Sequence, residues 1–253
     1  MQIVCGLFGL IWKLYIALVF SVFAILFYPF FLVILINPKW KKFSFKLFLV
    51  WSWLMRVFCL YGVKKIKNSE LPEGPYIIIA NHSSYLDIFL MYSILPKHRF
   101  VFLGKSEILS YPIIRTYFKN LNIPVFRGDK SKAGQSYNLA SKAVKEGWSI
   151  VIFPEGGIPD KQCPKMIPFK NGAFKLAKTL NIPILPLSFT NNYKLFSDPT
   201  EILGPARPGI ARVYIHEYVS QEQIQVMEVK ELNKLCFDQI NEPILAEYPH
   251  LKD

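Results

Sequence analysis

The feature that most restricts the fold is an uncharged run of 23 residues, 14–36, which lies between Lys13 and Asn37. A helix of this length can cross the roughly 30 Å hydrocarbon core of a bilayer. Pro29 lies inside the run, so a kink or a re-entrant turn is a second form that it can take. The run is too long for the apolar core of a signal peptide, and no small-x-small cleavage site follows it. The sequence therefore predicts a membrane anchor, with a buried helical hairpin as the alternative.

The charges of the first 69 residues indicate the same surroundings. No Asp or Glu precedes Glu70, whereas nine Lys and Arg residues do, in a chain whose formal net charge is +12. A basic segment without acids favours a polyanionic partner. Because these charges flank and interrupt apolar runs, they favour anionic membrane lipid over nucleic acid, whose binding arms are polar throughout.

A second apolar run, at 43–63, carries two basic residues and several Trp and Tyr rings. Charges on one side and aromatic rings at the boundary are typical of a helix that lies at the lipid headgroups. The positive-inside rule puts the basic cluster at 38–42 on the cytoplasmic side. We therefore interpret residues 1–67 as hydrophobic and basic membrane-anchoring helices, and residues 68–253 as a separate domain.

After Asn68 the chain changes to short apolar runs that alternate with amphipathic stretches. Buried strands are predicted at 76–80, 99–103, 149–153, 182–189 and 210–219. Helices are predicted at 85–95, 106–119, 131–146, 172–180 and 223–247. This alternation predicts an α/β domain with a largely parallel central sheet flanked by helices. Ligands of such sheets bind beyond the carboxyl ends of the strands.

The cysteines indicate neither a disulfide framework nor a zinc site. The four residues, Cys5, Cys59, Cys163 and Cys236, are far apart in sequence and form no Cys-x-x-Cys pair. They are expected to be free thiols in a reducing compartment.

The first candidate for chemistry is Asn81-His82-Ser83-Ser84-Tyr85-Leu86-Asp87, directly after the strand at 76–80. On one helix, positions five apart point about 140° away from each other, so His82 and Asp87 meet only if a turn separates them. Ser84 can cap the helix, and Ser84-x-x-Asp87 resembles a capping box. A carboxylate there can hold one imidazole nitrogen and leave the other free as a base. The alternative is that Asp87 only caps a helix and His82 is a loop residue.

The second candidate is Phe153-Pro154-Glu155-Gly156-Gly157, at the end of the strand at 149–153. It places a carboxylate beside two glycines, whose backbone amides can cradle a phosphate or an oxyanion. The alternative is a tight turn with a solvated Glu.

Together, in this order and at this separation, the two segments resemble the glycerolipid acyltransferase family, in particular its bacterial members that act on 1-acyl-sn-glycerol-3-phosphate. Two further blocks agree with the resemblance: Lys105-x-Glu107 with Pro112 and Arg127, and the apolar proline-containing run at 182–187. The resemblance covers roughly residues 71–219.

The resemblance implies transfer of a fatty acyl group from acyl carrier protein or coenzyme A to the sn-2 hydroxyl of that lysolipid. The product would be phosphatidic acid, made for phospholipid biosynthesis at the cytoplasmic face of the cell (inner) membrane, without a metal or cofactor. His82 would be the general base, and Asp87 would fix its tautomer. The substrate-binding residues would be Glu155, Gly156, Gly157, Arg127 and Lys105.

The chain departs from the family where its third motif usually reads Glu-Gly-Thr-Arg, because here it reads Glu155-Gly156-Gly157-Ile158. Without that Arg, another acceptor, such as a lysophospholipid with a headgroup or a lyso-aminolipid, stays open. A lipid esterase is a weaker alternative, because the chain has no Gly-x-Ser-x-Gly. A nucleotide-binding module is also weaker, because Arg99 stands where a phosphate-binding loop before Gly104-Lys105-Ser106 needs its first Gly.

Overall fold

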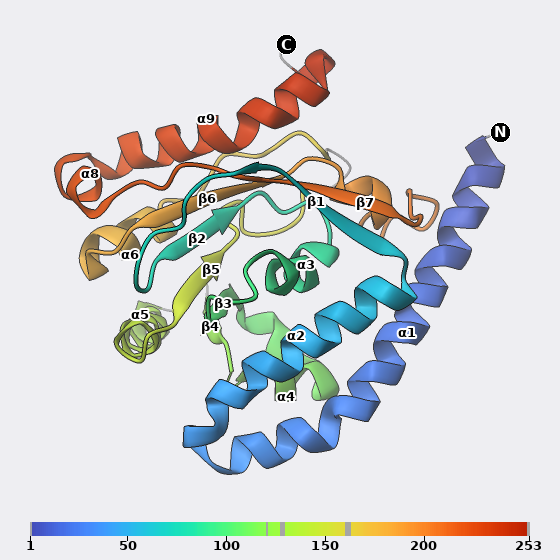
Figure 1. Cartoon of the computed structure of the whole chain (residues 1–253), viewed down its shortest axis with the longest axis horizontal. Helices are drawn as coiled ribbons and strands as arrows, with labels where there is room; N and C mark the ends of the chain where they lie inside the picture. The colour runs from blue at the N-terminus through green and yellow to red at the C-terminus, as the bar shows by residue number, and fades with distance from the viewer. Residues whose placement is uncertain (1, 120, 127–129, 160–162, 252–253) are drawn as a thin grey trace.

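The computed structural model describes residues 2–119, 121–126, 130–159 and 163–251. Within these ranges, one seven-stranded sheet has the order β1-β7-β6-β2-β5-β3-β4 (Figure 1). Neighbouring strands are parallel except β6 and β7, so the predicted α/β fold with a largely parallel sheet is confirmed. The strands are β1 Tyr61–Asn68, β2 Ile77–Ala80, β3 Phe100–Lys105, β4 Ile123–Val125, β5 Ser149–Ile152, β6 Ile184–Phe189 and β7 Gly209–Ile215.

Helices cover both faces of this sheet. The longest of the later helices, α9, lies across one face, while α2 and α3 lie on the other side (Figure 1). Every residue of the central strands β2, β5 and β6 is buried, as expected for apolar strands between two helical layers. The helices are α1 Gln2–Ile36, α2 Lys41–Phe58, α3 Leu86–Ile94, α4 Pro112–Lys119, α5 Lys130–Lys145, α6 Gly172–Leu180, α7 Asn192–Leu195, α8 Gln221–Val226 and α9 Val229–Glu247, with short 3-10 turns η1 Pro38–Trp40, η2 Ser106–Ser110 and η3 Pro249–Leu251.

Three differences from the predicted elements have local causes. Residues 61–67, which the sequence analysis placed with the anchoring helices, form β1, because α2 ends near Leu60, whose φ is +52°. The predicted helix at 106–119 is divided into η2 and α4 just before Pro112. The predicted helix at 223–247 is divided into α8 and α9, because Glu228 and Glu231 form a new capping box.

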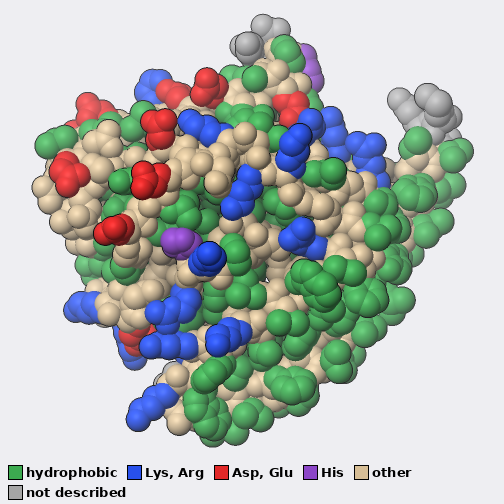
Figure 2. Space-filling model, viewed as in Figure 1, with side chains coloured by type: hydrophobic (Ala, Val, Ile, Leu, Met, Phe, Trp, Pro, Cys, Tyr) green, Lys and Arg blue, Asp and Glu red, His purple; other side chains and the backbone are tan. Residues whose placement is uncertain are grey.

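The N-terminal helices form a hairpin in which α1 has two unlike faces. Pro29 lies within one continuous helix. The inner face buries Phe23, Phe27 and Phe31, and the last two of these rings contact Trp51 of α2. The outer face exposes a row of large apolar side chains: Leu7, Ile11, Leu14, Leu18, Val22, Ile25, Leu26, Val33 and Ile36. Figure 2 shows hydrophobic side chains gathered over α1 and α2. By length and composition α1 is apolar enough to cross a membrane.

Candidate active site

The turn after β2 is fixed by the asparagine that precedes the histidine. The Asn81 side chain donates to the Phe189 carbonyl at 2.9 Å and accepts from the Phe189 N–H at 2.8 Å. This pair of bonds joins the ends of β2 and β6. His82 therefore lies at the carboxyl edge of the sheet, where ligands of parallel sheets bind.

The predicted contact between His82 and Asp87 is confirmed. Their Nδ1 and Oδ2 atoms lie 2.9 Å apart, and the side chains are 11% and 0% exposed. The same Oδ2 accepts the N–H groups of Ser83 at 2.8 Å and Ser84 at 3.0 Å. Two backbone N–H groups and the imidazole therefore converge on this one oxygen.

Only half of the predicted capping box forms, and the N-cap of α3 is Tyr85 rather than Ser84. The Asp87 carboxylate accepts the Ser84 N–H as expected, but the Ser84 hydroxyl accepts from the N–H of Leu86 at 3.1 Å and not from that of Asp87. That hydroxyl donates to the Phe196 carbonyl at 2.7 Å. The start of α3 is thus attached to the segment that follows α7.

This arrangement decides which nitrogen of His82 can act as a base. Oδ2 of Asp87 already accepts two backbone N–H groups, and as an acceptor toward the ring as well it assigns the ring proton to Nδ1 and the lone pair to Nε2. No residue in the described ranges is hydrogen-bonded to Nε2. Phe153 stacks on the ring, with centroids 4.1 Å apart. His82 can therefore take a proton at Nε2 while Asp87 stabilises the resulting imidazolium.

Glu155 joins this turn to a second loop. Its side chain is buried, and its oxygens accept the N–H of His82 at 2.8 Å and of Ile167 at 3.0 Å. Burial raises the pKa of Glu155 to about 7, against the effect of these two bonds, and the charge of Asp87 adds to the rise. Both oxygens thus bind the protein's own backbone.

The remaining predicted residues fall into three groups. Gly156 adopts a φ of +84°, and its N–H donates to the Phe153 carbonyl at 2.9 Å, within the turn. A Cβ on Gly157 would lie 3.1 Å from Nζ of Lys105, so the structure brings the end of β3 against this turn. Arg127 lies outside the described residues. The substrate-binding roles of all these residues stay predictions.

The sequence did not lead us to predict Asn192, which contacts Oδ1, the second oxygen of the Asp87 carboxylate. Asn192 donates from Nδ2 to Oδ1 of Asp87 at 2.7 Å. The available signal was the pair Asn191-Asn192 just past the predicted strand at 182–189.

The described residues contain no cluster of three or more His, Cys, Asp or Glu that could hold a metal ion. Gly104 lies in β3, where a Cβ would be 3.2 Å from the Phe118 ring, so this glycine is explained by close packing.

Comparison with known proteins places this chain in a class of transferases. The sequence model of the family described as Acyltransferase matches residues 61–190. The chain belongs to the acyltransferase family.

Two curated relatives carry a more specific name, 1-acyl-sn-glycerol-3-phosphate acyltransferase. A Caenorhabditis elegans protein, provisionally so named, is 30% identical over 80% of this chain and 70% of its own length. A Saccharomyces cerevisiae protein is 31% identical over 74% of this chain, which spans 61% of that relative.

A solved structure has the same fold. The crystal structure of the 1-acyl-sn-glycerophosphate acyltransferase PlsC from Thermotoga maritima matches with a TM-score of 0.77, covering 98% of both chains at 21% identity.

Proposed function

We propose that this chain transfers a fatty acyl group from a thioester carrier to the sn-2 hydroxyl of 1-acyl-sn-glycerol-3-phosphate, giving phosphatidic acid. The observation that carries the proposal is the His82 ring at the carboxyl edge of the sheet, which is held through Nδ1 by Asp87 and whose Nε2 has no hydrogen bond to the residues that the structure describes. The names of the relatives support this acceptor and this reaction.

The proposed reaction needs one proton shuttle. Nε2 of His82 takes the proton of the acceptor hydroxyl while its oxygen attacks the thioester carbonyl. The tetrahedral intermediate then expels the thiolate, which receives the same proton from the imidazolium. The new ester and the free thiol are the products, and the base returns to its neutral form. General-base assistance of this kind contributes about 10²–10⁴ in rate.

The charges near His82 suggest where the phosphate of the acceptor binds. The ammonium of Lys105, beside Gly157, is suited to the acceptor phosphate, and Arg127 is proposed to share this role. The acyl donor is proposed to be acyl carrier protein or coenzyme A, with no metal or cofactor taking part.

The apolar outer face of α1 supports attachment to a membrane. Its exposed Leu and Ile side chains continue over Ile113 and Ile114 of α4. Because the inner face of α1 packs on the protein, the proposed anchor lies along the bilayer surface with its outer face in the lipid.

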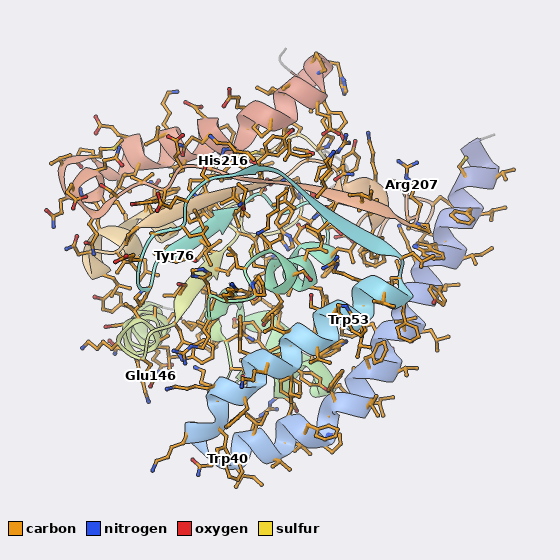
Figure 3. All side chains as sticks on the ribbon, viewed as in Figure 1. Trp40, Trp53, Tyr76, Glu146, Arg207 and His216 are labelled. Carbon is orange, nitrogen blue, oxygen red and sulfur yellow. The ribbon has the colours of Figure 1, made fainter. Side chains whose placement is uncertain are left out.

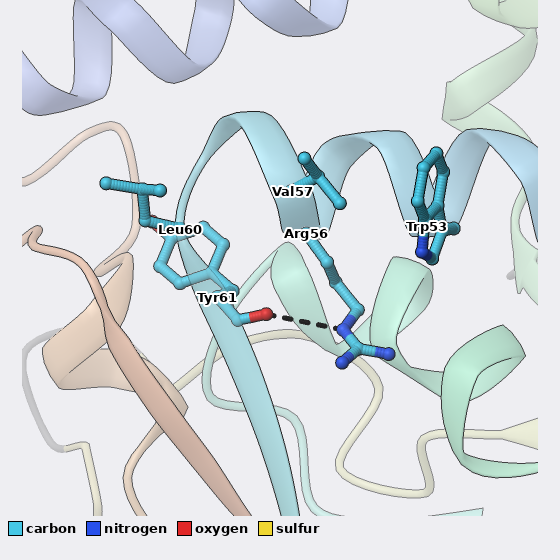
Figure 4. A pocket seen from close by; sticks show the side chains of 5 residues that line it. All are labelled: Trp53, Arg56, Val57, Leu60 and Tyr61. Carbon is cyan, nitrogen blue, oxygen red and sulfur yellow. Dashed lines mark hydrogen bonds between the residues drawn. The ribbon is translucent and has the colours of Figure 1, made fainter.

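A shallow hollow at the end of α2 suits an anionic lipid. Arg56 lies there among Trp53, Val57, Leu60 and Tyr61, and its Nε donates to the Tyr61 carbonyl at 3.3 Å (Figure 4). A guanidinium beside exposed apolar side chains can bind a lipid phosphate at the level of the headgroups. We place the enzyme on the cytoplasmic face of the cell membrane.

Acyl transfer by the purified chain tests the proposal. The enzyme in detergent is given acyl-coenzyme A or acyl-carrier protein with a panel of lysolipids, and products are identified by mass spectrometry. Phosphatidic acid is the expected product. Free fatty acid without a transferred chain would identify an esterase, and preference for another lysolipid would correct the acceptor.

Vesicle flotation tests the anchor with one substitution at two exposed valines. Val22→Glu, on the outer face of α1, should lower binding to anionic vesicles several-fold, whereas Val226→Glu on α8 should leave binding unchanged. Equal binding by both variants would contradict attachment through α1.

A further inference from the structure

A fully buried amide contacts the carboxylate of Asp87 from the side opposite the histidine. Asn192 is the first residue of α7, just past the carboxyl end of β6, and is 0% exposed. Its Nδ2 lies 2.7 Å from Oδ1 of Asp87. The contact joins residues 105 positions apart in sequence.

The donors around Asp87 are divided unequally between its two oxygens. Oδ2 accepts from His82, Ser83 and Ser84. Within the described ranges, Oδ1 accepts from Asn192 alone. Without this donor, Oδ1 would be a buried charged oxygen with no partner, and the plane of the carboxylate would be held from one side only.

The neighbouring asparagine shows what a purely structural amide does in the same place. Asn191 donates to the Ile210 carbonyl at 2.9 Å and accepts from the Arg212 N–H at 2.8 Å. Both ends of that amide hold the backbone of β7. Asn192 uses only its N–H end, and its buried Oδ1 has no partner among the residues that the structure describes. An unpaired buried acceptor is costly, so the structure retains this amide for its bond to Asp87.

We propose that Asn192 is a positioning residue, which orients the Asp87 carboxylate and thereby sets the basicity of His82. The inference rests on the proposed acyl transfer. The positive end of the amide dipole faces the carboxylate, which weakens the negative potential at the imidazole. Removing the amide therefore favours the protonated ring, so His82 becomes an available base only at higher pH.

Other ionisable groups near this pair stay in place in each variant below. Glu155 accepts the His82 N–H, and Cys163 lies near Asp87 and Glu155. Asp198 and Glu201 act on Cys163 from the loop after α7, and Lys105 lies beside Gly157. A shift in Asn192→Leu, which adds no ionisable group, is therefore attributable to loss of the bond with Asp87.

The test uses the same substitution at two adjacent positions. Asn192→Leu should lower kcat about 10-fold to 100-fold, the range seen when a group that orients a metal-binding histidine is removed. It should leave KM nearly unchanged and move the acid limb of the kcat profile to higher pH. Asn191→Leu should destabilise the fold more, because two backbone groups lose partners, without moving the acid limb. Asn192→Asp places a second buried carboxyl group against Asp87, and only one of the two can ionise, so the new group should keep its proton and donate it to Asp87. Its acid limb should therefore move less than that of Asn192→Leu.

A measurement without turnover separates the two proposals. The titration midpoint of the His82 ring is followed by NMR of histidine-labelled protein in detergent, with the signal assigned by its loss in His82→Gln. It should rise in Asn192→Leu, rise less in Asn192→Asp and stay unchanged in Asn191→Leu. An unmoved midpoint in Asn192→Leu would overturn the inference even if the wild type transfers acyl groups. Absence of transfer by the wild type would overturn only the proposed function. If neither Asn192 variant folds, the amide is structural and the inference fails.

Discussion

Each of the two edges of the sheet holds a histidine with little exposure, His82 at one and His216 at the other. The two imidazoles differ in their hydrogen-bond partners. His82 follows β2 at the carboxyl edge. His216 follows β7 at the opposite edge, because β7 runs antiparallel to β6 and β6 runs parallel to β2. His216 lies between α9 and the sheet (Figure 3). Its Nε2 is 2.7 Å from the hydroxyl of Ser188, which donates to the Ile240 carbonyl of α9 at 2.8 Å.

The difference shows how surroundings determine the role of an imidazole. Because Ser188 gives its only proton to Ile240, Nε2 of His216 must be the donor between them. Burial lowers the pKa of His216 to about 4, and Lys67 adds to this effect. His216 is therefore a neutral structural residue. At the other edge, a carboxylate holds the ring of His82 at Nδ1, and no residue in the described ranges is hydrogen-bonded to its Nε2.

The largest expected effect separates the two histidines by function. His82→Ala should lower kcat by about 10²–10⁴, because the general base is lost. Its urea unfolding midpoint should stay close to that of the wild type, since the ring lies at the end of a turn. His216→Gln keeps an N–H for Ser188 and should retain full activity. Near-normal turnover by His82→Ala would refute its role, and a similar loss in His216→Gln would remove the contrast.

The next effect concerns stability in acid. The unfolded chain protonates His216 near pH 6.5, whereas the folded chain resists protonation until about pH 4. The unfolded state therefore binds more protons in this window, and stability is lost as the pH falls through it. At about 1.4 kcal/mol per pH unit, this loss is about 3 kcal/mol. His216→Gln cannot titrate, so on going from pH 7 to pH 4 its free energy of unfolding, measured with urea, should rise relative to that of the wild type by about this amount. Parallel curves would contradict the burial argument.

Glu155 should change the stability with pH by a similar amount and in the opposite direction. Its pKa is raised from 4.5 to about 7, so the folded state binds the proton more tightly. Its contribution to stability is complete below pH 4.5 and is lost as the pH rises to about 7, by about 3 kcal/mol. In the wild type, the contributions of Glu155 and His216 to the free energy of unfolding therefore change with pH in opposite directions. Glu155→Gln should therefore be the more acid-sensitive protein, and His216→Gln the more sensitive to rising pH. Two variants with the same pH slope would contradict the assignment.

The contrast also shows which parts of the molecule sequence reasoning could predict. Contacts within one turn could be predicted. A strand that ends before His82, a helix that begins after it and a carboxylate five positions further on predicted the contact between His82 and Asp87. Apolar runs located the central strands, but β1 carries three lysines and β4 has only three residues, so neither has a clear apolar pattern. Contacts between distant segments were not accessible. Asn192 and Glu155 reach the histidine turn only through the order of strands in the sheet, which local patterns do not encode.

The smallest expected effect tests whether the carboxyl edge also depends on one backbone conformation. Gly156 has a φ of +84°, where an L side chain costs about 1–2 kcal/mol. Gly156→Ala should therefore lower the free energy of unfolding by about 1 kcal/mol and, by turning Glu155 away from the His82 N–H, lower kcat several-fold. Gly134→Ala is the matched control, because Gly134 lies in α5 with open space around it and should be stabilised by about 0.5–1 kcal/mol. Urea unfolding and the acyl transfer assay measure both. If Gly156→Ala were as stable and active as Gly134→Ala, the turn would tolerate a side chain, and the geometry of the carboxyl edge would depend on side-chain hydrogen bonds alone.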